Sequence, residues 1–241
     1  EQLSLESHPV SSRNMQYDSG RDFWWLLLRP WIAIPRLIQV LWTLSGLVIV
    51  LLLRGSSSDA DVQRGLARRI LKTLTGLGPC FIKLGQALST RPDLVRRDWL
   101  EELTRLQDDL PAFPHSVALS RIEQELGAPA EQLFEEFPSA PIAAASLGQV
   151  YKARLEGQSW VAVKVQRPNL TFILRRDLVL IRALGVLTAP FLPLNLGFGL
   201  GSIIDEFGRS LFEEIDYEQE ADNAERFATL FADNPAVYVP R

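Results

Sequence analysis

The pattern of apolar and polar positions along the chain changes twice. Apolar residues recur at helical spacing between residues 62 and 137, and the same spacing returns after Leu174. Between these regions, segments 148–155 and 160–165 have the composition of strands, and Gly157-Gln158 predicts a turn that joins them. The pattern therefore predicts an α+β chain, in which a small antiparallel sheet separates two groups of helices.

Caps, prolines and periodicity divide the helical regions into elements. A linker over 55–61 precedes a helix over 62–77, with Ser58 or Asp59 as its N-terminal cap. Further helices are expected over 79–89, 98–108, 116–126, 131–137, 175–189, 201–214 and 217–231.

The N-terminal region has two parts of different character. Residues 1–21 are polar and are expected to be disordered. Segment 22–54 is apolar, with tryptophans near Arg29 and Arg36, and Pro30 and Pro35 interrupt its start. Its uncharged run over 37–53 would reach about 25 Å as a helix, against roughly 30 Å for a hydrocarbon core. We expect a membrane-associated segment; a helix on the membrane surface, a full span and a helix buried in protein all stay open.

Composition and charge narrow the function classes. The chain has 25 Lys+Arg against 29 Asp+Glu, so it lacks the basic excess that nucleic-acid binding needs. One cysteine and two histidines exclude an internal disulfide framework and make a Cys/His zinc site untenable. Cys80 is expected to be a small buried apolar residue, and no metal ligand is assigned.

The chemistry is concentrated around the predicted hairpin. Lys164 lies within the apolar run 161–165, so its ammonium points to one face of a strand while its neighbours point to the other. Upstream of the hairpin is a loop of small residues, which are Ala143, Ala144, Ala145 and Ser146. A loop of small side chains lets backbone N–H groups approach phosphates, and a nearby lysine can pair with them. A lysine on an edge strand is the plainer interpretation of Lys164 taken alone.

Two further motifs, one on each side of the loop and the hairpin, make the pattern specific enough to compare with a known family. Lys83-Leu84-Gly85-Gln86 precedes the loop, and Glu214-Ile215-Asp216 follows the hairpin. Together with the alanine-rich loop and Lys164, these motifs resemble the UbiB/AarF family of atypical kinase-like proteins over residues 55–241. The resemblance implies a helical extension over 55–138 and a kinase-like N-lobe over 139–241, truncated before the C-lobe. It also implies a role in isoprenoid quinone (ubiquinone or plastoquinone) or membrane lipid homeostasis.

The resemblance also implies roles for single residues. Lys164 would contact the α- and β-phosphates of ATP or ADP, Glu220 would orient Lys164, and residues 143–146 would cover the phosphates. The gating residues would be Lys83, Gly85, Gln86, Glu214 and Asp216, with Lys83 and Gln86 also near the nucleotide. Two plainer alternatives remain. Lys83 and Gln86, which share a helix face, could simply be solvated, and the acidic residues Glu214 and Asp216 could form an ordinary charged helix terminus.

Several features bound this interpretation. Segment 197–201 is glycine-rich but follows Lys164, and 205–208 is not an Asp-Phe-Gly motif because Glu206 intervenes. The sequence holds no His-Arg-Asp loop, so we expect a piece of a longer protein with Mg²⁺ ligands beyond Arg241.

Two functions stay open: an atypical kinase or ATPase, and a non-catalytic pseudokinase-like scaffold of a quinone-biosynthesis complex. The expected partners are nucleotide, a membrane lipid or quinone intermediate, and quinone-biosynthesis proteins. The kinase-like domain should face an ATP-containing compartment, which is the cytoplasm or an organellar stroma or matrix.

Overall fold

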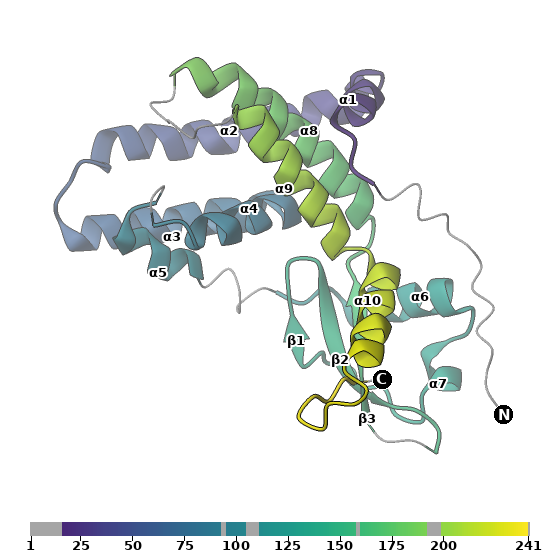
Figure 1. Cartoon of the computed structure of the whole chain (residues 1–241). Coiled ribbons are helices and arrows are strands. Elements are labelled where there is room, and N and C mark those ends of the chain that lie inside the picture. The colour runs from purple at the N-terminus through teal and green to yellow at the C-terminus, as the bar shows by residue number, and fades with distance from the viewer. Residues whose placement is uncertain (1–15, 93–94, 105–110, 158–159, 192–198, 241) are drawn as a thin grey trace. The chain divides into compact units, whose positions relative to one another are not determined.

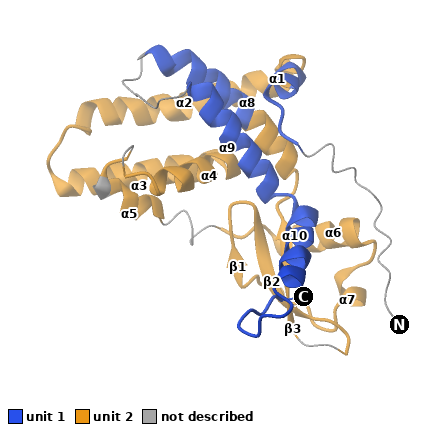
Figure 2. Ribbon diagram, viewed as in Figure 1, with its two compact units in different colours: residues 1–25, 178–241 blue, residues 26–177 orange. Residues whose placement is uncertain are grey.

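The computed structural model describes residues 16–92, 95–104, 111–157, 160–191 and 199–240 (Figure 1). They form helices and one three-stranded antiparallel sheet of order β1-β2-β3, which confirms the predicted fold class. Contacts along the chain define two compact units (Figure 2). The larger unit is Leu26–Asp177, and the smaller unit combines Glu1–Trp25 with Leu178–Arg241.

Helices α2 (Pro30–Arg54) and α3 (Ala60–Leu77) form an antiparallel hairpin in the larger unit. Three hydrogen bonds from a side chain to a backbone carbonyl set their alignment: Arg36 to Leu77, Arg69 to Gly46 and Gln63 to Gly55. The start of α2 therefore meets the end of α3, and the end of α2 meets the start of α3. Apolar side chains fill the seam, because Val40 and Leu47 of α2 are buried.

Helix α2 is longer than the uncharged run in the sequence suggests. Its 25 residues include Pro35, which lies near the start of the helix and does not interrupt it. Pro30 occupies the first helical turn, where a missing N–H costs nothing. Among the residues described, α2 is the one helix long and apolar enough to cross a membrane, although a core helix or a signal sequence meets the same criterion.

Local signals place the next helices. The Asp59 side chain accepts from the Asp61 N–H at 2.8 Å and caps α3, as predicted. Gly78 has a φ of 100°, which lets the chain turn directly into Pro79 and helix α4 (Pro79–Ser89). Helix α5 (Arg97–Thr104) packs against α3 and α4.

The sheet packs one face on a small apolar core. Strand β1 (Ala143–Ala144) pairs with β2 (Gly148–Arg154), which pairs with β3 (Trp160–Gln166). Helices α6 (His115–Leu126) and α7 (Ala130–Leu133) supply the other side of the core. The buried members of this cluster are Ala118, Ile122, Ala130, Phe134, Tyr151, Ala153 and Val165.

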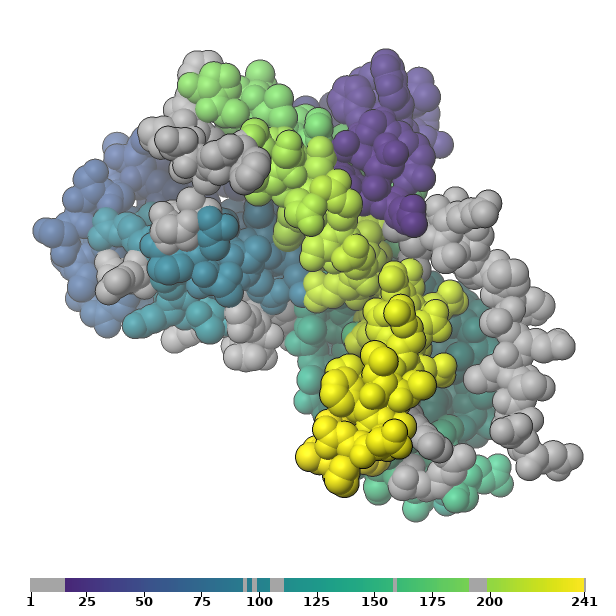
Figure 3. Space-filling model, viewed as in Figure 1, coloured from purple at the N-terminus to yellow at the C-terminus, as the bar shows by residue number. Residues whose placement is uncertain are grey.

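The remaining helices are α1, α8, α9 and α10. Their bounds are α1 (Ser19–Leu27), α8 (Leu170–Thr188) with the short 3-10 helix η2 (Ala189–Phe191), α9 (Leu200–Glu214) and α10 (Tyr217–Leu230). Helix α10 has no buried residue, and Figure 3 shows its atoms at the surface. In the smaller unit, the Tyr17 hydroxyl donates to Asp205 Oδ1 at 3.0 Å, and the Tyr17 ring lies against Phe212. Asp205 also accepts from Arg182 Nε at 2.7 Å.

Some predictions about local structure differ from the structure. The helix expected over 131–137 ends at Leu133, because Glu136 leaves the helix to form a β-bridge with Arg154 at the end of β2. Part of the expected small-residue loop, at Ala143 and Ala144, is a short strand that β2 holds by pairing. The helix expected over 98–108 reaches Thr104, and 105–108 lies outside the described residues, as does Gln158 of the turn.

The prediction of a disordered segment over 1–21 does not hold for residues 16–21. Tyr17 is buried, and Ser19 begins helix α1. Packing of the Tyr17 ring against α9 is close: a Cβ at Gly208 would lie 2.7 Å from that ring. Residues 1–15 lie outside the described residues, and the division of the chain into four segments stays a prediction.

Candidate nucleotide site

Lys164 lies on the face of the sheet that points away from the core. Val150 of β2 is directly opposite Lys164 on one side and opposite Ala143 of β1 on the other. Residues opposite one another in an antiparallel sheet share a face, so Ala143, Val150 and Lys164 form a row across three strands. The burial pattern of β3 agrees, because Lys164 is exposed while Val165 is buried. The predicted direction of the Lys164 side chain is confirmed.

The residues between β1 and β2 make a tight connection. Ala145 N–H donates to Gly148 O at 2.8 Å, and Ile142 N–H donates to Val150 O at 2.8 Å. Ser146 is buried as a whole residue. The connection is therefore a short, hydrogen-bonded loop of small residues at the edge of the Lys164 face.

Arg167 holds this loop from outside the hairpin. Its Nε and Nη2 donate to Ala145 O at 3.2 and 3.0 Å, and Nη2 also donates to Pro111 O at 2.9 Å. Its guanidinium lies over the Phe113 ring, and burial lowers the pKa of Arg167. Arg167 is thus a positioning residue that the sequence analysis missed. No local signal identifies it, because its two carbonyl partners are 22 and 56 residues away.

A buried glutamine supports the loop from below. Gln149 Oε1 accepts from the Phe113 N–H at 3.1 Å, and Gln149 Nε2 donates to the Tyr151 hydroxyl at 2.6 Å. Burial raises the pKa of Tyr151, and the hydrogen bond from Gln149 acts in the opposite direction. The segment at Phe113 is therefore joined to the sheet by Gln149 and to the loop by Arg167.

The Lys-x-Gly-Gln residues lie on helix α4 in the same compact unit as Lys164. Gly85 is buried, whereas Lys83 and Gln86 are half-buried and share a side of the helix. Cys80, Phe81 and Ile82 anchor the start of α4, and Cys80 is fully buried, as predicted. Burial first, and the neighbouring Asp177 second, raise the pKa of the Cys80 thiol well above its ordinary value.

The Glu-x-Asp residues lie at the junction of α9 and α10 in the smaller unit. Glu214 ends α9, and Asp216 caps α10 by accepting from the Gln219 N–H at 3.0 Å. Burial, followed by the charges of Glu220 and Glu214, raises the pKa of Tyr217 at this junction to about 12. Glu220 lies in the first turn of α10. Because Glu220 and Lys164 belong to different units, their pairing stays a prediction.

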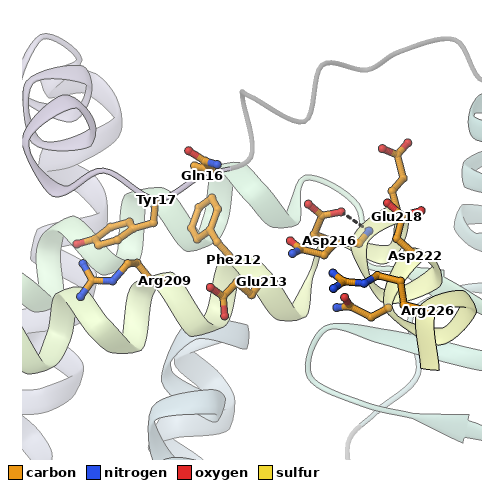
Figure 4. Close-up of a pocket in the computed structure, with 11 residues that line it drawn as sticks. Gln16, Tyr17, Arg209, Phe212, Glu213, Asp216, Glu218, Asp222 and Arg226 are labelled. Carbon is orange, nitrogen blue, oxygen red and sulfur yellow. Dashed lines mark hydrogen bonds between the residues drawn. The ribbon is translucent and has the colours of Figure 1, made fainter. Parts of the chain in front are cut away.

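A cavity of about 720 Å³ opens beside this junction (Figure 4). Tyr17, Phe212 and Asp216 are among its lining residues, and the dashed line in Figure 4 marks the cap that Asp216 makes to Gln219. The lining also carries Glu213, Asp222, Arg209 and Arg226. Asp216 is therefore both a helix cap and part of a polar hollow.

Outside the undescribed segments, no three His, Cys, Asp or Glu side chains lie close enough together to hold an ion. The segment 205–208, which is not an Asp-Phe-Gly motif, lies within helix α9, as predicted. Of 197–201, the first two residues lie outside the described part and Gly199 immediately precedes α9. The sheet face and its loop thus offer small apolar side chains and the ammonium groups of Lys164 and Lys152, a set suited to a nucleotide.

Comparisons with known proteins match the sequence of this chain to a family. A family model described as the ABC1 atypical kinase-like domain matches residues 105–241. Uncharacterized protein slr1919 of Synechocystis sp. is 49% identical over 213 residues, which cover 88% of this chain and 38% of that protein. Protein ACTIVITY OF BC1 COMPLEX KINASE 1, chloroplastic, of Arabidopsis thaliana is 45% identical over 212 residues, covering 86% of this chain and 31% of that protein. The chain spans only part of the length of either relative.

One solved structure is also similar in sequence. It is the complex of Rv3197 with erythromycin from Mycobacterium tuberculosis, 32% identical, covering 76% of this chain and 46% of that chain, with a TM-score of 0.45. A TM-score this low does not establish a shared fold.

Proposed function

The chain belongs to the ABC1 (AarF/UbiB-type) family of atypical kinase-like proteins, and from this premise we propose that it is the nucleotide-binding part of an atypical kinase or ATPase. The observation that carries the proposal is the row of Ala143, Val150 and Lys164 on the exposed sheet face. A cation, a small-residue loop and an apolar surface on one face are what a nucleotide needs.

The residues fit ATP or ADP in three ways. Lys164 would donate to the α- and β-phosphates from β3. The loop formed by Ala143, Ala144, Ala145 and Ser146 would cover the phosphates, and Arg167 holds that loop through Ala145 O. Small side chains on the Lys164 face, such as Ala162, leave room for the flat base. Bound ATP with Mg²⁺ would supply the transferable phosphoryl group and neutralise its charge.

Glu220 is proposed to orient Lys164. A lysine close to a desolvated site loses its charge more easily, and a facing carboxylate keeps it protonated and aimed. Lys83, Gly85 and Gln86 on α4, with Glu214 and Asp216, are proposed to gate access to the nucleotide. Mg²⁺ ligands are not assigned to residues of this chain.

Membrane lipid or an isoprenoid quinone intermediate is the proposed substrate class or partner. The apolar helix α2 supports lipid proximity, and two relatives carry chloroplastic names that are consistent with an organellar location. We place the protein at a membrane, with the kinase-like domain facing an ATP-containing compartment. The competing function is a pseudokinase-like scaffold of quinone-biosynthesis proteins, for which bound nucleotide would be a conformational signal.

ATP turnover by the full-length protein with lipid vesicles tests this proposal. Lys164→Ala should abolish turnover and the rise in melting temperature that ADP produces. The matched control is Lys152→Ala, because Lys152 is opposite Ala162 on the same sheet face but on the neighbouring strand. Equal turnover in Lys164→Ala and wild type would contradict the catalytic proposal. Nucleotide protection without turnover would favour the scaffold.

A further inference from the structure

The exposed face of α2 is mainly apolar, with Gln39 and Ser45 as its exposed polar residues after Trp31 and before Arg54. Its large exposed apolar side chains follow helical spacing on either side of Ser45: Trp31, Ile34, Ile38, Leu41, Trp42, Val48, Ile49, Leu52 and Leu53. We call this set the apolar face of α2. Between Trp31 and Leu53 the only charged residue is Arg36, which is buried on the other side of the helix. The stripe from Trp31 to Leu52 is about 32 Å long at the rise of an α-helix.

The opposite side of α2 is held by protein. Hydrogen bonds join α2 to α3 near the start, the middle and the end of the hairpin. Arg36 also makes a two-pronged ion pair with Asp177, with Nη2 to Oδ2 at 2.7 Å and Nε to Oδ1 at 3.0 Å. Helix α2 therefore cannot leave α3 without opening a buried ion pair and the seam around Val40 and Leu47.

Helix α3 is unlike a lipid-embedded helix. Its exposed charged side chains are Asp61, Arg64, Arg68, Arg69 and Lys72. If α2 crossed a bilayer, the antiparallel packing would carry these charges into the hydrocarbon core, where each is costly. A helix that lies flat avoids this cost, because only its apolar face enters the membrane while α3 stays on the aqueous side.

We propose that α2 lies in the plane of a membrane surface and does not span the bilayer; this inference rests on the proposed membrane association. The occupant of the apolar face is the interface of a bilayer that contains anionic lipids. Charge complementarity supports this choice: exposed Arg54 ends α2, and Arg69, which reaches Gly46 O on α2, shares a side of α3 with Lys72. Exposed Trp31 and Trp42 are suited to the headgroup boundary. The exposed polar side chains beside this face already bond within α2: Gln39 accepts from Arg36 at 2.8 Å, and the Ser45 hydroxyl donates to the Trp42 carbonyl at 2.9 Å.

The depth of labels along α2 separates the two orientations. Single cysteines at Ile34, Ser45 and Leu52 would carry an environment-sensitive dye in the full-length protein, while buried Cys80 does not compete for label. The protein is bound to vesicles of phosphatidylcholine and phosphatidylglycerol that carry quenchers at known depths. A surface helix gives the same shallow depth at all three positions. A spanning helix gives the greatest depth at Ser45, and that result would overturn this inference while leaving membrane association intact.

Substitutions paired with matched controls test whether an anionic membrane covers the apolar face of α2. Leu52→Glu on α2 should weaken vesicle binding at least about tenfold. Its matched control is Leu230→Glu on α10, because Leu52 and Leu230 are 80% and 78% exposed; this control should bind like wild type. Arg69→Gln with Lys72→Gln should lose about fivefold per charge on anionic vesicles and little on neutral ones. If folded wild-type protein binds no vesicle, both membrane association and this inference fail. If Leu52→Glu binds normally, the face has another occupant and this inference fails.

Discussion

The two halves of the larger unit arrange polar and apolar groups in opposite ways. Around the sheet, the buried cluster is apolar apart from Gln149, and the charged Lys164 and Lys152 lie on the outer face. In the hairpin of α2 and α3, Arg36 and Gln63 are buried beside the apolar seam, Arg36 pairs with Asp177 of α8, and the outer face of α2 is mainly apolar. The sheet region thus has the usual arrangement of a water-soluble domain, with apolar side chains inside and charged side chains outside. Helix α2, in contrast, exposes apolar side chains, which suits an apolar environment.

Because of this difference, the groups that stabilise the fold and the groups that are available for binding are of different kinds in the two regions. An apolar interior stabilises the sheet and leaves its polar face available for a charged ligand. In the hairpin, burial of apolar area cannot by itself select which side of α2 meets α3, because apolar residues surround most of the helix. The buried polar groups select that side, since Arg36 and Gln63 are satisfied in one alignment of the two helices.

The largest effect is expected from the polar interior of the hairpin. Asp177→Asn keeps the volume of the side chain but leaves Arg36 buried without its counter-charge, so the free energy of unfolding should fall by about 3–5 kcal/mol. Urea unfolding followed by circular dichroism measures it. The control is Arg121→Gln, which removes an exposed pair with Glu125 on α6 and should cost about 0.3–0.5 kcal/mol. Equal losses in both variants would mean that the buried pair does not hold the hairpin.

The hydrogen bonds that Arg167 makes to the alanine-rich loop come next. Arg167→Ala removes the hydrogen bonds to Ala145 O and Pro111 O and should lower the free energy of unfolding by about 2 kcal/mol. It should also reduce the rise in melting temperature that ADP produces, because the loop is no longer held for binding. Arg167→Lys should restore stability only in part, since a lysine lacks the planar fork. Full ADP protection in Arg167→Ala would contradict a positioning role.

The apolar core of the sheet region should respond in smaller, graded steps. Ile122→Val on α6 removes one buried methylene and should cost about 1 kcal/mol. Leu126→Val on the same helix is the comparison, because Leu126 is exposed and its change should cost less than half as much. Chemical denaturation of the two variants side by side gives the difference. A loss in Ile122→Val as large as that in Asp177→Asn would erase the contrast between the two interiors.

The smallest effect on folding is expected on the apolar face of α2. Leu52→Glu should change the free energy of unfolding by less than about 0.5 kcal/mol in the absence of lipid, because Leu52 makes little contact with protein. The same variant is the one expected to lose vesicle binding. A destabilisation comparable to a core substitution would show that Leu52 is covered by protein, and the contrast between the two outer faces would then be wrong.

Much of the fold follows from patterns that a sequence shows directly. The Asp59 cap of α3, α4 over Pro79–Ser89 and the hairpin of β2 and β3 agree with prediction, and Lys164 points to the opposite face of its strand from its neighbours, as predicted. These features depend on neighbours a few residues away. The helix expected over 131–137 fails for the converse reason, because Glu136 bonds to a strand that comes later in the chain.

In the candidate site, too, some features could be predicted from the sequence and others could not. The order of the Lys-x-Gly-Gln, alanine-loop, lysine and Glu-x-Asp motifs is sufficient to indicate the family. The support of the loop by Arg167 and Gln149 could not be predicted, since both residues act on carbonyl or amide groups of distant segments. The roles of Glu220 and of the gating residues stay predictions.

The sequence by itself therefore determined the elements, the face on which Lys164 lies and the family of the chain, because short-range periodicity and motif order encode them. Only the tertiary structure decided which side of α2 is covered. Arg36 and Asp177 are 141 residues apart, and neither the length nor the composition of α2 distinguishes a spanning helix from one fastened along α3. That distinction depends on where a buried charge finds its partner, and this is a property of the folded chain.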